Sequence, residues 1–159
     1  ATDLAWLAKG YYVVSPVMTS QSGPLMEQWN KLYELLIANG FSSRPVLEGI
    51  GAGAGNVYAW AVEHPRQVAA VIAENPLMRS VMSKKTLTDE VTVLAEAGVP
   101  LLHICGSRDP WLQDNSRKVV TMYKQAGGKI RVVMQKDKGH FLDEAAVSAA
   151  VMDFAEGLR

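Results

Sequence analysis

Two hydrophobic patterns alternate along most of the chain. Short runs of apolar, often β-branched residues predict buried strands at 11–17, 44–49, 68–73, 99–105 and 129–135. Apolar residues at helical spacing predict helices at 1–9, 25–39, 53–64, 86–97, 111–125 and 142–158. Strands that alternate with helices build a parallel sheet with helices on both faces. The pattern therefore predicts an α/β fold with about five parallel strands.

Composition fits one globular domain spanning residues 1–159. Hydrophobic residues make up 48% and charged residues 20%, and no repeat or linker divides the chain. The 16 basic residues balance the 16 acidic ones, which gives no electrostatic reason to expect nucleic acid or a membrane as partner. No apolar run approaches the roughly 18 residues of a membrane span. The single Cys105 cannot form an internal disulfide, which favours a cytoplasmic protein without excluding export.

The most informative stretch is the predicted strand–turn–helix at residues 46–62. The strand runs into a glycine-dense turn, Gly49-Ile50-Gly51-Ala52-Gly53, and a helix follows. This arrangement resembles the nucleophile elbow of α/β-hydrolases, G-x-S-x-G, in which the central serine attacks the substrate. The outer glycines fit that pattern. The central position is Gly51, which has no side chain to act as a nucleophile.

Two more predicted strands end in loops with chemically useful residues. Gly106-Ser107-Arg108-Asp109-Pro110 follows the strand at 99–105, and Lys138-Gly139-His140-Phe141 follows the strand at 129–135. Because the carboxyl ends of parallel strands share one edge of a sheet, we expect Asp109 and His140 to lie near Gly51. Nucleophile, acid, then histidine is also the chain order of the α/β-hydrolase triad.

These matches make the chain similar to the C-terminal two thirds of an α/β-hydrolase of the bacterial esterase or peptidase kind. The resemblance covers residues 44–142 and includes the turn at Gly51 with its helix, the Asp109 loop and the Gly139-His140 loop. It implies that Asp109 orients His140 and that His140 acts as general base and acid. It also implies that the N–H of Ala52 forms half of an oxyanion hole.

Each of these residues also has a plainer interpretation. Asp109 can cap the helix that follows it, and His140 can be a surface histidine in a loop that contains charged residues. Trp111 and Phe141, which adjoin the two loops, can line a substrate pocket or can simply be aromatic residues at the edge of the core. His103, in the middle of a predicted strand, is expected to be a satisfied core histidine.

Gly51 leaves several explanations open. The protein can be a natural pseudo-hydrolase, or an engineered inactive variant, or it can use another nucleophile, for which Ser20 and Ser22 are the candidates. The glycine-rich turn also weakly resembles a dinucleotide-binding loop, with Glu74 as the acid that would bind a ribose.

The resemblance implies that two features are missing from this chain. One is a strand between those predicted at 11–17 and 44–49, and the other is the loop that supplies the second oxyanion-hole N–H. We therefore expect a fragment or a shortened fold, associated with a further N-terminal segment or with a second copy of the chain. The expected activity is hydrolysis of a small-molecule ester, impaired or absent because of Gly51, without a cofactor or a metal. The alternative is a non-catalytic domain that binds a ligand or partner in the same cleft.

Overall fold

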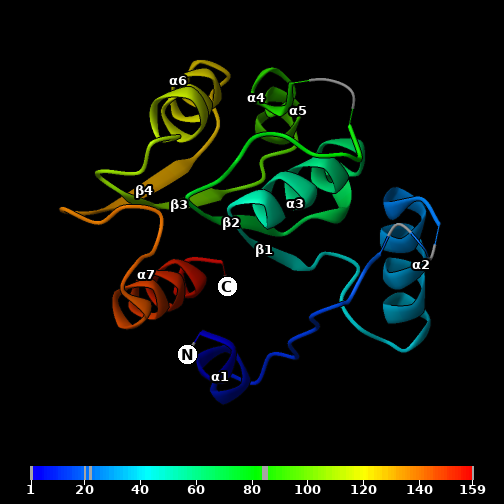
Figure 1. The fold of residues 1–159 in the computed structure, drawn as a ribbon. Coiled ribbons are helices and arrows are strands. Elements are labelled where there is room, and N and C mark those ends of the chain that lie inside the picture. Colours follow the sequence, from blue (N-terminus) through cyan, green and yellow to red (C-terminus); the bar gives the residue numbers. More distant parts are fainter. Residues whose placement is uncertain (1, 20, 22, 84–85, 159) are drawn as a thin grey trace.

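The computed structural model describes residues 2–19, 21, 23–83 and 86–158 (Figure 1). At its centre is a parallel four-stranded sheet in the order β1-β2-β3-β4. The strands are β1 (Val46–Ile50), β2 (Ala70–Glu74), β3 (Leu101–Gly106) and β4 (Ile130–Gln135). The order in space follows the order in the sequence, so each crossover leads to the neighbouring strand. The predicted α/β architecture is confirmed.

Helices cover both faces of the sheet (Figure 1). One face carries α3 (Ala52–Glu63), α4 (Leu87–Glu90), α5 (Thr92–Glu96) and α6 (Lys118–Gln125). The other face carries α1 (Thr2–Ala8) and α7 (Glu144–Glu156). The remaining elements are α2 (Leu25–Ala38), a 3₁₀ turn η2 (Pro65–Gln67) and a π-helical turn η3 (Gln113–Arg117). Among the described residues, no helix is both long and apolar enough to span a bilayer.

The central strands are apolar because both of their faces are covered. Every residue of β2 and of β3 is buried, as expected for parallel strands that lie between two layers of helices. Side chains of β2 alternate between the two cores: Val71 and Ala73 pack towards α3, whereas Ile72 packs towards α7. This packing fixes the register of the sheet and therefore the positions of the loops at its carboxyl edge.

The prediction of a strand at 11–17 is wrong. These residues form no regular element, and Tyr12 and Val17 are 78% and 94% exposed. β-branched and aromatic residues favour a strand only where a neighbouring strand supplies hydrogen bonds and packing. In the described part of the chain β1 pairs with β2 alone, so its other edge faces no strand. The sheet accordingly has four strands instead of five.

Helix α2 packs against the rest of the molecule through aromatic contacts with Trp60 of α3. Its Trp29 ring stacks on Trp60 of α3 with centroids 6.2 Å apart, and its Asn30 accepts a hydrogen bond from Trp60 Nε1 at 2.9 Å. None of its residues is fully buried. The helix predicted at 25–39 is thus present, but it contributes little to the central core.

Candidate functional site

Gly51 lies at the sharp turn between β1 and α3. Its backbone angles are φ 52° and ψ −118°, a conformation that residues with a side chain rarely adopt. Its N–H donates to the Glu74 carbonyl at 2.9 Å, and its carbonyl accepts from the N–H of Leu77 at 3.0 Å. These bonds hold the turn against the carboxyl end of β2. A side chain at position 51 would therefore point in a fixed direction at the carboxyl edge of the sheet.

The direction of a side chain at position 51 would be towards His140. A Cβ atom built on Gly51 would lie 3.1 Å from His140 Nε2 and 3.3 Å from His140 Cε1. Among the described residues, no other heavy atom outside the neighbouring residues would lie within 4 Å of it. The two positions predicted to converge from separate loops are therefore adjacent in space.

Asp109 and His140 are joined by a hydrogen bond of 2.7 Å between Asp109 Oδ2 and His140 Nδ1. The Asp109 side chain is nearly fully buried, whereas the His140 side chain is 30% exposed. The other carboxylate oxygen, Oδ1, accepts from the N–H of Trp111 at 2.8 Å. Asp109 thus has both of the contacts expected from its two interpretations, with a different oxygen for each.

The sequence analysis missed Asn75, which connects the two loops. Its Oδ1 accepts from the N–H of Gly106 at 2.9 Å, and its Nδ2 donates to the carbonyls of His140 at 2.8 Å and Gly139 at 3.2 Å. The residue is 3% exposed and has a positive φ of 38°, which asparagine tolerates better than most residues. Its place directly after β2, at the carboxyl edge of the sheet, was the signal that could have identified it.

The residues expected to contact a substrate surround the His140 ring. The Trp111 ring meets it edge-on at a centroid distance of 5.2 Å, and the Phe141 ring lies at 6.0 Å. Trp111 is 44% exposed and Phe141 is 90% exposed. Ala52 is the first residue of α3, so its N–H has no hydrogen-bond partner within the helix.

His103 is part of the core, as predicted. It is fully buried, with Nε2 at 2.7 Å from the Tyr58 hydroxyl and Nδ1 at 2.7 Å from Ser116 Oγ. Burial lowers the pKa of His103 to about 3, so it stays neutral at physiological pH. It is distinct from the exposed-edge histidine, His140.

Gly49, in β1, and Gly55, in α3, are explained by close packing. A Cβ atom on Gly49 would lie 2.7 Å from the Ala54 backbone, and one on Gly55 would lie 1.9 Å from the Arg79 carbonyl oxygen. Glycine is therefore needed for the helix to lie against the strand and the following loop. Ser20 and Ser22, the alternative nucleophiles, are outside the described residues. No group of three or more possible metal-ligating side chains converges among the residues that the structure describes.

The structure is similar to several solved α/β-hydrolase structures. A carboxylesterase from Bacillus cereus superposes with a TM-score of 0.63 at 14% identity, over 92% of this chain and 67% of the carboxylesterase. Esterase PE8 superposes with a TM-score of 0.61 at 19% identity, over 79% of this chain and 56% of the esterase. The chain therefore has the α/β-hydrolase fold.

An uncharacterized protein from Bacillus cereus ATCC 10987 is similar over nearly the whole chain. The TM-score is 0.79 at 15% identity, over 98% of this chain and 53% of that protein. This chain thus spans about half the length of that similar structure. No family model and no curated protein sequence matches the chain.

Proposed function

We propose that this chain carries the acid and base of an esterase-type acyl hydrolase, with Gly51 at the nucleophile position. The observation that carries the proposal is the alignment of three positions. Asp109 Oδ2 lies 2.7 Å from His140 Nδ1, and His140 Nε2 lies 3.1 Å from where a Cβ on Gly51 would be. The similarity in fold to a carboxylesterase and an esterase supports the same class of reaction.

Each residue has a role in this scheme. The Asp109 carboxylate accepts a hydrogen bond from the N–H at Nδ1 of His140, which leaves Nε2 free to take a proton from a hydroxyl at position 51. The hydroxyl oxygen would then attack the ester carbonyl carbon, and the N–H of Ala52 would stabilise the resulting oxyanion. The ester C–O bond would break as His140 gives its proton to the departing alcohol, and a water molecule activated by His140 would then release the acid. Trp111 and Phe141 would contact the acyl or alcohol group. Since Gly51 supplies no hydroxyl, the chain is expected to be impaired or inactive.

The proposal is tested by hydrolysis of short chromogenic esters. Gly51→Ser is expected to gain activity over the parent, and Gly51→Ala is the matched control, because it adds the same Cβ without a nucleophile. A side chain at this φ costs about 1–3 kcal/mol, so both variants should be equally destabilised. The His140 ring, which is partly exposed, must move by a few tenths of an ångström to admit the new Cβ. Equal rates for the two variants, both folded, would contradict the proposal.

A non-catalytic binding role is the second candidate. It is favoured by Gly51 itself, because removal of the nucleophile from such a site lowers the rate by about 10⁶ in the best-studied case. The same cleft would then bind a ligand or partner without turnover. This role predicts that Gly51→Ser is inert while small esters still perturb the His140 resonances in NMR spectra.

The proposed association with a further N-terminal segment or a second copy is supported by the N-terminal surface. Tyr12, Val14 and Val17 are exposed apolar residues, and the outer edge of β1 pairs with no strand of the described chain. Light scattering of the 159-residue chain tests the second-copy form: a dimer that Val17→Lys dissociates would support it. A monomer at high concentration would contradict it.

A further inference from the structure

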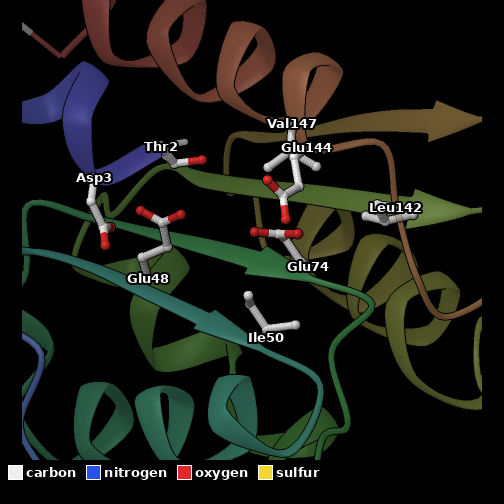
Figure 2. Close-up of a pocket in the computed structure, with 8 residues that line it drawn as sticks. All are labelled: Thr2, Asp3, Glu48, Ile50, Glu74, Leu142, Glu144 and Val147. Carbon is white, nitrogen blue, oxygen red and sulfur yellow. The ribbon is translucent and has the colours of Figure 1, made fainter.

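A cavity of about 230 Å³ lies on the α1–α7 side of the sheet, at the carboxyl ends of β1 and β2 (Figure 2). Its polar lining is acidic. The carboxylates come from the sheet and from the α1–α7 layer that covers it. The described residues that line the cavity include no lysine, arginine or histidine. The four acidic residues are Asp3 of α1, Glu48 of β1, Glu74 of β2 and Glu144 of α7.

Glu74 is the residue that distinguishes this cavity from an ordinary acidic surface. It is only 9% exposed, and its carboxylate has no hydrogen-bond or ion-pair partner among the described residues. Figure 2 shows this carboxylate directed into the cavity, opposite that of Glu144. Glu48, by contrast, accepts a hydrogen bond of 3.0 Å from Trp6 Nε1. Ionisation of a largely buried carboxylate is unfavourable without a partner, so a positively charged group of a ligand would stabilise the ionised form.

The pKa of Glu74 reflects its burial among other carboxylates. Burial, together with the nearby carboxylates of Glu48 and Glu144, raises its pKa to about 7. At neutral pH the group is therefore divided between its neutral and charged forms. A cation in the cavity would favour the charged form, so binding should release protons.

The geometry favours an organic cation over a metal ion. A metal needs several oxygens at about 2.0–2.6 Å from one point, and the described acidic residues do not converge in that way. An ammonium or guanidinium group spreads its donors over hydrogen bonds of about 2.7–2.9 Å, which suits carboxylates on separate elements. A cavity of this size accommodates such a group with part of its alkyl chain.

The cavity adjoins the candidate catalytic site. Ile50, which lines it, directly precedes Gly51, and Leu142, which also lines it, follows His140 by two residues. We propose that the cavity binds the ammonium or guanidinium group of a ligand through Glu74, Glu48 and Glu144. Resting on the proposed function, this ligand is the substrate, so the preferred ester carries a positively charged group. The same chemistry can also come from a lysine or arginine side chain of another polypeptide.

Binding to the parent protein tests the cavity without relying on catalysis. The probes are n-propylguanidinium and its neutral isostere n-propylurea, compared by calorimetry at pH 7. The guanidinium is expected to bind at least tenfold more tightly and to release about half a proton, seen as a dependence of the heat on the buffer. Glu74→Gln should weaken binding at least tenfold, and Glu144→Gln, at the rim, should weaken it less.

The matched control is Glu63→Gln, which removes one charge from an exposed residue of α3 on the opposite face of the sheet. It should leave binding within twofold of the parent. Equal affinities for the guanidinium and the urea would overturn the cavity proposal. So would a Glu74→Gln variant that binds as tightly as Glu63→Gln.

Catalysis then identifies the source of the cation. In the Gly51→Ser background, the 4-nitrophenyl esters of Nα-acetyl-lysine and Nα-acetyl-norleucine are compared. A tenfold or greater preference in kcat/KM for the lysine ester, removed by Glu74→Gln, supports a cationic substrate. Hydrolysis of both esters at equal rates overturns the assignment of the ligand as substrate. The cation that the cavity binds would then be a lysine or arginine side chain of another polypeptide. Hydrolysis of neither ester contradicts the proposed function alone, because binding to the cavity is measured separately.

Discussion

The side-chain amide of Asn75 donates a hydrogen bond of 2.8 Å to the backbone carbonyl of His140. The same side chain accepts from the N–H of Gly106, at the end of the strand that leads to Asp109. One buried side chain therefore sets the distance between the loop of the proposed acid and the loop of the proposed base. Its side-chain hydrogen bonds go to backbone groups, so we regard it as a positioning residue.

Asn75→Asp should separate positioning from stability. Aspartate keeps an acceptor for Gly106 but cannot donate to the His140 carbonyl, so the His140 loop should lose its anchor. In the Gly51→Ser background we expect kcat to fall by about 10–100-fold with little change in KM, as for misplacement of a catalytic group. Asn30→Ala, which removes a hydrogen bond between α2 and Trp60, is the control that lowers stability without changing kcat. Parallel effects of the two variants would show that Asn75 is structural only.

The two oxygens of Asp109 allow its capping role to be separated from its catalytic role. Asp109→Asn keeps an acceptor for the N–H of Trp111, so the free energy of unfolding should change by less than about 1 kcal/mol. Asp109→Ala leaves that N–H unpaired and should cost about 1–3 kcal/mol. In the Gly51→Ser background, Asp109→Asn should still lose about 10³-fold or more in kcat. Denaturant unfolding measures the effect on stability, and ester hydrolysis measures the effect on activity. A fully active Asp109→Asn variant would show that Asp109 caps the helix and has no catalytic role.

Glu74 should make the protein less stable as the pH rises. Its pKa is raised from 4.5 in the unfolded chain to about 7 in the folded protein, so between these values the folded state binds more protons. Its contribution is therefore most favourable below pH 4.5 and is lost as the pH rises towards 7 and above. The charged groups that line the cavity with it, Asp3, Glu48 and Glu144, are all acidic. Glu48 and Glu144 add to the effect of burial on its pKa.

Glu74→Gln removes this pH dependence. Because water in the open cavity screens part of the effect, the variant should gain about 1–2 kcal/mol over the parent at pH 8 and little at pH 4.5. Urea unfolding at both values measures the difference, with Glu63→Gln as the variant that should show none. A gain that is the same at pH 4.5 and pH 8 would show that Glu74 titrates normally.

Most of the fold could be predicted because its central strands, β2 and β3, are buried on both faces. The apolar runs that became β2 and β3 are unambiguous, and glycine or proline marks the ends of several helices. The adjacency of Gly51 to His140, and of His140 to Asp109, also follows from topology, since all three residues follow the carboxyl ends of parallel strands. The role of each residue in chemistry stays a prediction.

The parts that could not be predicted depend on contacts between distant segments. The 11–17 run has the composition of a strand, but strand formation needs a neighbour that the local pattern does not reveal. The acidic cavity depends on the register of β1 against β2, which pairs Ile50 with Glu74 and places Glu48 on the same face as Ile50. Asn75 looks like an ordinary loop residue until its three side-chain partners are known.

The central claim is that His140 activates whatever hydroxyl is placed at position 51. The most direct measurement is covalent labelling of Gly51→Ser by a fluorophosphonate, with the modified residue located by peptide mass spectrometry. We predict one label at position 51, at least 100-fold slower formation when His140→Ala is added, and no label there in Gly51→Ala. Labelling that is absent in the folded Gly51→Ser variant, or that is unaffected by His140→Ala, would contradict the account.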